Sequence, residues 1–203
     1  MIIPKLLHNQ RRIGLTGGIA SGKSTITKYI RKNKRIPILD ADNLSKELIM
    51  PNTIGYKKIL GYFGNQILDK YSSEKIINRK LLKKIIFEDA HHREWIQKLL
   101  HPLIKEKMIE ECNVYKNNEI ILLVIPLLFE AKFEDICTEI WLVKCSELEQ
   151  IQRLIRRDKI SEEKARKIIK LQLNFEAKQK LSDVILDNSD DTNQWIYKIK
   201  ELI

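Results

Sequence analysis

One eight-residue segment near the amino end carries the strongest chemical signal in this sequence. Gly17-Gly18-Ile19-Ala20-Ser21-Gly22-Lys23-Ser24 fits the pattern G-x-x-x-x-G-K-[ST], which is typical of a phosphate-binding loop, or P-loop. Glycines in such a loop let backbone N–H groups turn inward around a phosphate chain without a clash from Cβ. A helix starting at Lys23 would add the positive end of its dipole. The alternative is a glycine-rich turn with a solvated lysine, but a buried strand expected just before the segment favours the P-loop.

The residue types of the loop predict which part of a nucleoside triphosphate each would hold. Lys23 would bridge the β- and γ-phosphates, and the Ser24 hydroxyl would bind Mg²⁺. Thr25 can add N–H and hydroxyl contacts to the α-phosphate. The remaining expected contacts come from the loop at Gly17, Gly18, Ala20, Ser21 and Gly22. The predicted ligand is therefore ATP or GTP, with Mg²⁺.

Two carboxylates follow the second expected strand, in the run Ile38-Leu39-Asp40-Ala41-Asp42. Motor ATPases and helicases instead place their acid after a long apolar strand, and here the run ending at Ile125 meets no acid before Glu130. In a parallel sheet the second strand would bring its acids beside the P-loop, one for the metal and one for an acceptor hydroxyl. Either Asp40 or Asp42 could instead cap the helix that follows.

A pair of arginines could supply positive charge to a phosphoryl group in transfer. Arg153 and Arg157 are four residues apart, so they share one face of a helix that Ser146 opens. A second helix begins shortly after Asp158, and a helix–turn–helix with arginines is typical of a lid over the nucleotide. The alternative is that these arginines pair with nearby acids on a solvated surface.

The composition limits the classes of protein that the chain can be. It has 203 residues, of which 43% are hydrophobic, enough to form one core and too apolar for disorder. The longest apolar run, 120–129, is about half of the roughly 18 residues that a membrane span needs. The 3 cysteines form no C-x-x-C pair, and no signal peptide is visible. We therefore expect a cytoplasmic protein that does not enter a membrane.

Apolar runs and helical spacing alternate along the chain and indicate its architecture. Strands are expected at 12–16, 36–40, 120–125, 140–143 and 184–186. Helices are expected at 23–34, throughout 41–116 and at 192–203. Two more helices are expected between these, one that starts at a capping box of Ser146 and Glu149 and one that runs from Ser161 to about Leu181. This order predicts an α/β fold, a three-layer P-loop kinase-like fold with a five-stranded parallel sheet. Residues 1–40, 117–145 and 183–203 would form the nucleotide-binding core. Residues 41–116 would form a helical substrate-binding insertion and 146–182 a helical lid, while residues 1–9 read as a frayed arm.

Several motifs occur in an order that resembles one enzyme family. They are Ile13–Thr25, Asp40-Ala41-Asp42, Arg79 with Leu82 and Ile86-Phe87, Leu99-Leu100-His101-Pro102-Leu103, Pro126-Leu127-Leu128-Phe129-Glu130, Arg157-Asp158 and Asp183–Asn188. The chain is similar in these motifs to the dephospho-CoA kinases, which use ATP to phosphorylate the 3′-hydroxyl of dephospho-CoA in the last step of coenzyme A synthesis. The resemblance spans roughly residues 12–200.

The resemblance implies roles for further residues. It places a CoA-binding domain at 41–116 and makes Asp42 the base on the acceptor hydroxyl. It also places Arg79 and His101 near the acceptor. On the residues alone, His101 before Pro102 fits the start of a helix as well as it fits a ligand.

Some positions depart from the family's pattern. Ala20 stands where the loop often has glycine, and alanine fits there if the residue keeps a negative φ. Lys46 replaces an arginine or histidine. The second part of the lid often reads Gln-x-x-Arg with another arginine following, whereas this chain has Gln172, Phe175 and Lys178. The two arginines of the first lid helix therefore remain the predicted ATP contacts of the lid.

The working hypothesis is an ATP-dependent kinase acting on dephospho-CoA. A kinase for another small metabolite or a nucleoside monophosphate is the alternative within the same class. A P-loop ATPase stimulated by nucleic acid is the alternative from another class, suggested by a net charge of +10. Aromatic residues make up only 7% of the chain, and no aromatic-plus-basic RNA motif appears, so nucleic acid is not the expected partner.

Overall fold

The computed structural model of the chain describes residues 10–189 and 192–203. The frayed arm predicted for residues 1–9 lies outside them. The chain divides into a first unit, made of the residues up to Asp40 together with Cys112–Ile203, and a second unit, Ala41–Glu111. The helices of the described residues include none long and apolar enough to cross a membrane.

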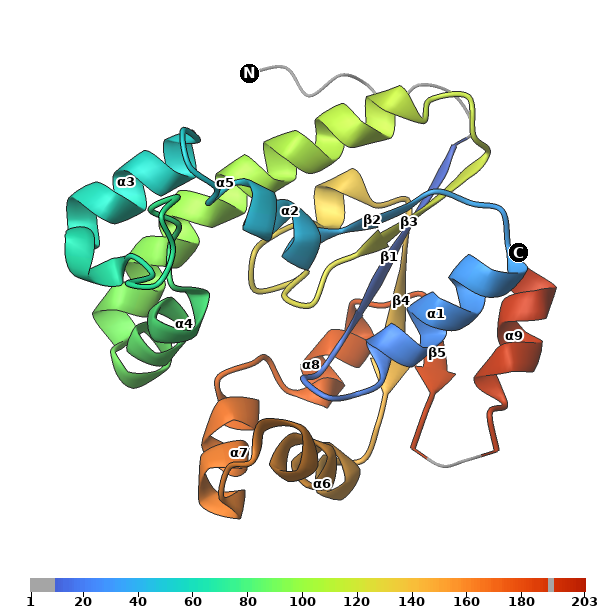
Figure 1. Cartoon of the computed structure of the whole chain (residues 1–203). Coiled ribbons are helices and arrows are strands. Elements are labelled where there is room, and N and C mark those ends of the chain that lie inside the picture. The colour runs from blue at the N-terminus through green and yellow to red at the C-terminus, as the bar shows by residue number, and fades with distance from the viewer. Residues whose placement is uncertain (1–9, 190–191) are drawn as a thin grey trace. The chain divides into compact units, whose positions relative to one another are not determined.

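A parallel sheet forms the centre of the first unit (Figure 1). Its strands are β1 (Arg11–Gly17), β2 (Ile38–Asp40), β3 (Ile120–Val124), β4 (Glu139–Lys144) and β5 (Val184–Asp187). The order is β2-β3-β1-β4-β5, and every pairing is parallel. The predicted five-stranded sheet is confirmed. The carboxyl end of β2 lies at the same edge of the sheet as the end of β1, but β3 lies between the two strands and separates them by about 10 Å.

One face of the sheet is covered by α1 (Lys23–Asn33) and α9 (Trp195–Leu202), which lie side by side in Figure 1. Alternate residues of the strands point to this face, because side chains of a strand alternate between its two sides. Ile13 and Leu15 of β1 pack there with Ile26 and Ile30 of α1. The rings of Tyr29 and Trp195 meet edge to face at 5.3 Å. This packing fixes the axis of α1, and so the direction in which its first turn points.

The opposite face of the sheet explains one glycine of β1. A Cβ on Gly14 would lie 2.6 Å from Cys137 Sγ and 2.8 Å from Leu128 Cδ1. Leu128 follows β3, and Cys137 follows the short 3₁₀ helix η2 (Glu134–Ile136). The segments after β3 therefore approach the backbone of β1 more closely than any side chain at position 14 would allow.

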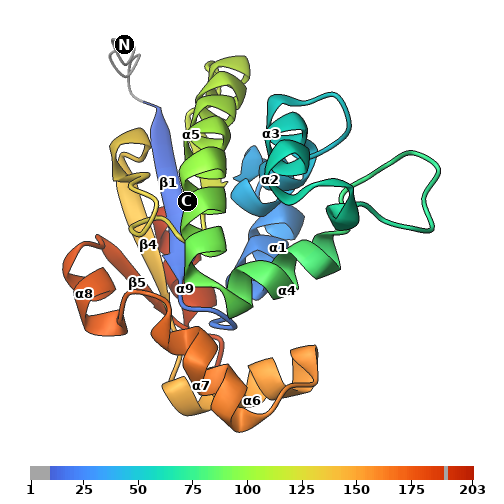
Figure 2. The ribbon, with the colours of Figure 1, turned by 90° about the vertical axis from the view of Figure 1, so that its left-hand side faces the viewer.

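Three short helices follow β4: α6 (Glu147–Asp158), α7 (Glu162–Lys170) and α8 (Phe175–Lys180). Ser146 caps α6 by accepting the Glu149 N–H at 3.2 Å, whereas the Glu149 carboxylate pairs with Arg153. A single helix from Ser161 to about Leu181 is a wrong prediction. The helix breaks after Lys170, and Asn174 begins α8 by accepting the Ala177 N–H at 2.9 Å. Figure 2 shows α6 and α7 packed together near the end of β1.

The second unit is helical and has its own core. Its helices are α2 (Ala41–Glu47), α3 (Ile54–Phe63), η1 (Asn65–Ile67), α4 (Arg79–Glu88) and α5 (Ala90–Val114), which continues past the unit's end. The buried core is Ile49, Tyr56, Ile59, Phe63, Ile67, Ile77, Leu82 and Ile96. The uninterrupted helical pattern predicted for 41–116 is wrong between η1 and α4, where Leu68 and Ile77 form an antiparallel bridge.

Candidate active site

The P-loop joins β1 to α1 and is shaped by two residues with left-handed backbone. Ala20 has φ 59° and Gly22 has φ 98°. The condition that Ala20 keeps a negative φ is therefore not met, and the loop holds an alanine in a conformation that glycine adopts more easily. The Lys23 ammonium folds back over the loop and donates to the carbonyl oxygens of Gly17 at 2.7 Å and Gly18 at 2.9 Å. The lysine is thus already positioned over the loop.

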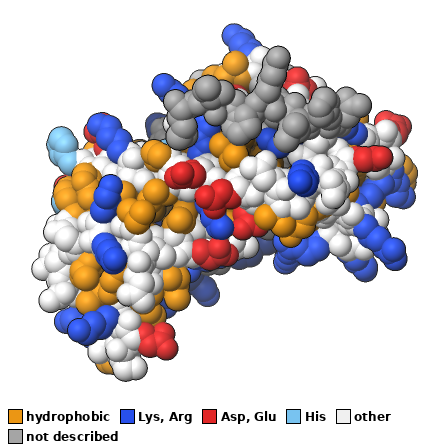
Figure 3. Space-filling model, turned by 90° about the horizontal axis from the view of Figure 1, so that it is seen from above, with side chains coloured by type: hydrophobic (Ala, Val, Ile, Leu, Met, Phe, Trp, Pro, Cys, Tyr) orange, Lys and Arg blue, Asp and Glu red, His pale blue; other side chains and the backbone are white. Residues whose placement is uncertain are grey.

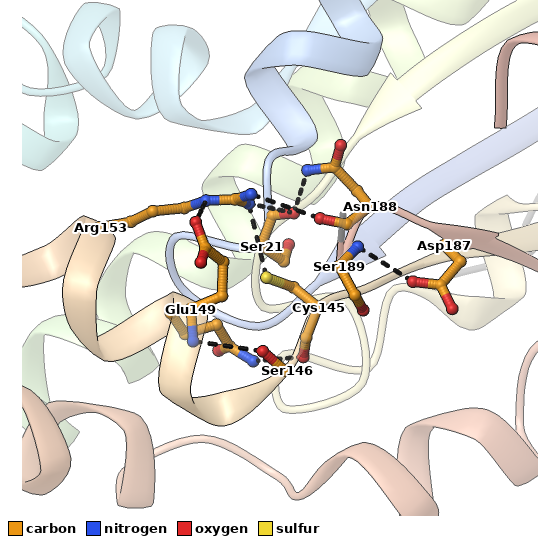
Figure 4. Close-up of polar contacts among 9 residues, drawn as sticks. Ser21, Cys145, Ser146, Glu149, Arg153, Asp187, Asn188 and Ser189 are labelled. Carbon is orange, nitrogen blue, oxygen red and sulfur yellow. Dashed lines mark hydrogen bonds and ion pairs between the residues drawn. The ribbon is translucent and has the colours of Figure 1, made fainter. Parts of the chain in front are cut away.

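The carbonyl group of Ser21 is held from outside the loop, as Figure 4 shows. Asn188 Nδ2 donates to it at 2.9 Å, and Arg153 Nη1 at 3.4 Å. Because a trans peptide group directs its C=O and N–H to opposite sides, this fixes the Gly22 N–H on the far side from Asn188. Inward-pointing N–H groups are what an anion-binding loop requires. Asn188 follows β5, so the end of one strand sets the backbone of the loop that follows another.

Gly22 is also required for its lack of a side chain. A Cβ there would collide with the Asn188 carboxamide nitrogen and come within 3.5 Å of Arg153 Nη1. Asn188 itself is only 6% exposed, so it has little room to move away. Glycine is therefore required at this position for two separate reasons: the left-handed φ of the backbone and the lack of space for a Cβ.

Arg153, predicted to contact the nucleotide, packs against the loop itself. Its guanidinium pairs with Glu149 at 2.8 Å and donates to the Asn188 carbonyl oxygen at 3.4 Å. Arg153 Nη1 also lies 3.4 Å from Cys145 Sγ, and burial raises the pKa of that thiol. In this arrangement the Arg153 guanidinium donates hydrogen bonds to the backbone carbonyl groups of both Ser21 and Asn188.

Arg157, the second predicted lid arginine, is exposed near the end of α6. It makes two 2.8 Å hydrogen bonds with the carboxylate of its neighbour Asp158, which raise the pKa of Arg157. Both arginines are therefore paired with nearby acids, as the alternative interpretation of the sequence stated. A phosphate would have to compete with Asp158 for Arg157.

The helices α6 and α7, predicted to belong to a lid, share a hydrophobic core with the P-loop. Ile151 and Leu154 of α6 and Ala165 of α7 are buried together, and Ile19 and Ala20 pack against them. A hydrogen bond adds to this contact, since the Ile19 N–H donates to Gln172 Oε1 at 2.7 Å. The loop that should hold the phosphates and the segment predicted as a lid are thus directly connected.

Two residues in the second part of the predicted lid have clear places in the structure: Gln172, which matches the family's pattern, and Lys178, which departs from it. Gln172 contacts the P-loop from the turn between α7 and α8. The Lys178 side chain is 1% exposed, and its ammonium lies 2.9 Å from Glu130 Oε1. A buried ammonium beside its counter-ion is poorly placed to reach a nucleotide, which explains why Lys178 cannot replace an exposed lid arginine here.

The two carboxylates expected beside the P-loop, one for the metal and one for the acceptor hydroxyl, fall in different units. Asp40 is the last residue of β2, in the first unit. It lies at the carboxyl edge of the sheet, and the P-loop follows β1 at the same edge. Asp42 lies in the second unit, exposed in the first turn of α2, where a carboxylate is favoured by the helix dipole. It is inside the helix, so the prediction that it could be the cap is wrong. Asp40 stands directly before the helix, in the position of a cap.

Three further predicted or divergent positions also lie in the second unit. Arg79 is the exposed first residue of α4, after the capping residue Asn78. His101 lies inside α5, because this 25-residue helix continues through Pro102, so the prediction of a helix start there is wrong. Lys46 is exposed and donates to Asn43 Oδ1 at 2.8 Å.

Magnesium accompanying a nucleotide needs few protein ligands, because it keeps several waters and uses phosphate oxygens. The exposed hydroxyl of Ser24, in the first turn of α1, is a suitable oxygen donor, and so is a carboxylate at the end of β2. Within residues 10–189 and 192–203, no cluster of three or more His, Cys, Asp or Glu side chains suggests any other metal centre.

Sequence reasoning named the loop but not the residues that hold it. Asn188 and Glu130 belong to segments noted for the resemblance, and Gln172 to the segment compared with the family's Gln-x-x-Arg pattern, yet none had a role assigned. The face seen in Figure 3 shows Lys and Arg side chains interspersed with apolar, neutral and acidic ones.

Comparisons with known proteins identify the family of the chain. The family model for dephospho-CoA kinase matches residues 11–194. A dephospho-CoA kinase of Prochlorococcus marinus strain MIT 9312 is 71% identical over 203 residues, covering 100% of this chain and 99% of the relative. The structure of dephospho-CoA kinase from Campylobacter jejuni is 26% identical, with a TM-score of 0.66, and the match covers 94% of this chain and 96% of that one. A Thermus thermophilus structure shares the fold at 24% identity, a TM-score of 0.77 and 96% coverage of both chains. The predicted P-loop kinase-like fold is thus confirmed, and the chain belongs to the dephospho-CoA kinase family.

Proposed function

We propose that the protein transfers the γ-phosphoryl group of ATP to the 3′-hydroxyl of dephospho-CoA, giving coenzyme A and ADP. The observation that carries this proposal is the P-loop itself, in which the Ser21 carbonyl is held outward and Lys23 lies over the loop. The acceptor follows from membership of the family. The P-loop thus supports ATP as the phosphoryl donor, and membership of the family supports dephospho-CoA as the acceptor.

The loop and the first turn of α1 would bind the ATP phosphates. Lys23 would exchange its bonds to Gly17 and Gly18 for bonds to the β- and γ-phosphates. The backbone N–H groups between Ala20 and Thr25 would surround the chain of phosphates, and Ser24 would bind Mg²⁺. When bound, Mg²⁺ would supply positive charge between the β- and γ-oxygens.

Asp42 would orient the 3′-hydroxyl and accept its proton, and Arg79 and His101 would bind the acceptor. These three assignments rest on the family motifs, and the exposure of Asp42 and Arg79 leaves them accessible to a ligand. Because transfer passes through a loose transition state, positioning of the hydroxyl should matter more than the basicity of Asp42.

Arg157 would stabilise the charge that develops on the phosphoryl oxygens, and Arg153 would assist from its position against the P-loop. Arg157 is exposed and bonded to its sequence neighbour Asp158, so a phosphate can replace that partner without exposing a buried charge. Arg153 would act chiefly through its contact with Ser21.

The same proposal divides the chain by task. Residues 1–40, 117–145 and 183–203 would form the nucleotide-binding core, 41–116 the CoA-binding region and 146–182 the lid. ATP, Mg²⁺ and dephospho-CoA are then sufficient for turnover, and a cytoplasmic location fits these substrates.

A coupled assay of ADP release tests nucleotide use and acceptor choice together. Purified protein with Mg²⁺-ATP is offered dephospho-CoA, nucleoside monophosphates, sugar acids or nucleic acid in separate reactions. We expect rapid ADP release with dephospho-CoA alone, together with coenzyme A detected by mass. A higher kcat/KM for another small alcohol would reassign the acceptor, and stimulation only by nucleic acid would replace the kinase with an ATPase.

A further inference from the structure

The turn between α7 and α8 contacts the P-loop through one side chain. Gln172 Oε1 accepts the Ile19 N–H at 2.7 Å. Ile19 is the third residue of the P-loop, and its side chain packs on the lid core. A backbone N–H that is bonded in this way has a fixed direction, and the flanking peptide groups have less freedom.

The same turn is held from its other side by a buried ion pair. Glu130 Oε1 accepts the Leu173 N–H at 3.0 Å and lies 2.9 Å from Lys178 Nζ. The side chain of Lys178 is 1% exposed and that of Glu130 19%. Burying two charges is costly unless they are paired, so each one holds the other in place. The pair joins the segment after β3 to α8, and the Leu173 N–H is bonded to the same Glu130 oxygen.

We propose that Gln172 is a positioning residue for the P-loop, held in place by the Glu130–Lys178 ion pair. This rests on the proposed function only in taking the loop as the ATP site. Glu130 fixes the backbone of residue 173, which is bonded directly to residue 172, and the Gln172 side chain then fixes Ile19. Together with Asn188 on Ser21, it holds the loop at two residues.

A loop that is held in its binding shape loses less conformational freedom when ATP arrives. The effect of Gln172 should therefore appear in ATP affinity, and in KM for ATP more than in KM for the acceptor. One hydrogen bond contributes enough to change affinity by about threefold to tenfold. A residue with a merely structural role would lower thermal stability without separating the two KM values.

The first test compares two variants that make the same chemical change on neighbouring segments. Gln172→Met removes the acceptor at nearly constant size, and Gln179→Met makes the same change at an exposed position of α8. The dissociation constant of Mg²⁺-ATP is measured by calorimetry, and kcat and both KM values are measured with dephospho-CoA.

We expect Gln172→Met to weaken ATP binding about threefold to tenfold, with KM for the acceptor within twofold of the parent value and Gln179→Met unchanged. Unchanged ATP affinity in Gln172→Met overturns the proposal. Tighter ATP binding also overturns it, since Gln172 would then be competing with phosphate for the Ile19 N–H. Calorimetry needs no turnover, so parent protein that binds ATP but leaves dephospho-CoA untouched refutes the proposed acceptor and leaves this inference standing.

The second test asks whether the ion pair acts through Gln172. Lys178→Met should weaken ATP binding, and combining it with Gln172→Met should weaken binding little further, because both changes release the same contact. Lys178→Arg keeps the charge and should restore most of the affinity. Fully additive effects in the double variant, or an Arg variant as weak as the Met variant, would overturn the role of the pair. If Lys178→Met does not fold, Glu130→Gln with Lys178→Met removes both charges and keeps an acceptor for Leu173.

Discussion

Asn188 Nδ2 donates a 2.9 Å hydrogen bond to the carbonyl oxygen of Ser21, and the same nitrogen occupies the space that a Cβ on Gly22 would need. A single carboxamide thus sets the orientation of one peptide group and excludes a side chain from the next residue. The relation joins the end of β5 to the loop after β1, which are 167 residues apart in the chain.

Gly22→Ala should therefore be severely damaging. The left-handed φ of 98° costs alanine about 1–2 kcal/mol, and the added methyl displaces Asn188 from Ser21. We expect a lower free energy of unfolding in urea and loss of measurable ATP binding by calorimetry. Gly61→Ala is the matched control, because it lies in the helix α3 with nothing within 4 Å of the added Cβ. The control should be stabilised by about 0.5–1 kcal/mol. Equal behaviour of the two variants would contradict this account.

Lys23→Ala should nearly abolish turnover. The lysine is the loop's only ammonium placed over the Gly17 and Gly18 carbonyl groups in the structure as described, and loss of one preorganised charge lowers kcat on the order of 10²–10³-fold. Lys28→Ala removes an exposed lysine from the same helix and should retain the parent kcat. ADP release at saturating dephospho-CoA measures both. A Lys23→Ala enzyme within tenfold of the parent would remove Lys23 from catalysis.

Asp42→Asn should lower kcat with little effect on ATP binding. The amide keeps the size of the side chain but cannot take the proton of the 3′-hydroxyl, and general-base catalysis is worth about 10²–10⁴-fold. Glu47→Gln makes the matched change at an exposed position of the same helix. Steady-state kinetics with an independent ATP titration separates the two effects. An unchanged kcat in Asp42→Asn would exclude Asp42 as the base.

Arg157→Ala should lower kcat on the order of 10²-fold while the fold stays stable, because the side chain is exposed and bonded only to its neighbour Asp158 in the contacts described. Arg156→Ala, its exposed neighbour on α6, is the control and should lose little activity. The pair of variants distinguishes a specific contact with the phosphoryl group from a general effect of positive charge. Equal losses in the two variants would favour the general effect.

Cys137 should make the fold sensitive to alkaline pH. Burial raises the pKa of its thiol to about 12, from the ordinary value of 9.0. Above pH 9 the unfolded chain loses this proton while the folded chain keeps it, so stability falls as pH rises toward 12, by up to about 1.4 kcal/mol per unit. Cys137→Ala removes this term. The stability difference between parent and variant, from urea unfolding at pH 8 and pH 10.5, should shift in favour of the variant at the higher pH. A difference that is independent of pH would contradict it.

The sheet and the loop were predictable because their signals are local. A strand buried on both faces is a continuous apolar run, as at 120–125, and a P-loop needs glycine at fixed spacing. Strand order is a different matter, since it depends on which runs pair in three dimensions. The parallel sheet was predicted without an order of strands, and the structure shows that β3 lies between β1 and β2.

Long helices were harder to predict from periodicity than strands. The break between α7 and α8 depends on tertiary bonds, from Ile19 to Gln172 and from Leu173 to Glu130, while the local pattern of apolar residues continues through it. A different error occurred at Pro102, where one interpretation placed the start of a helix at His101, whereas α5 begins at Ala90 and continues through the proline.

The residues that hold the P-loop in place could not be predicted from the sequence, for a related reason. Asn188 and Gln172 are ordinary polar residues in turns, and only their distance from the loop backbone gives them meaning. Spacing on one helix correctly grouped Arg153 with Arg157, but it could not show that Arg153 turns toward Ser21 while Arg157 bonds to Asp158.

The packing of Ile19 and Ala20 into the core of α6 and α7 has a consequence for how such enzymes can be recombined. The pair of helices α6 and α7 is not a separable module, because two of the residues that complete its core are encoded more than 120 positions upstream. A crossover that takes the lid helices from a distant relative and leaves residues 19 and 20 behind would combine mismatched surfaces. The two segments must therefore be inherited together.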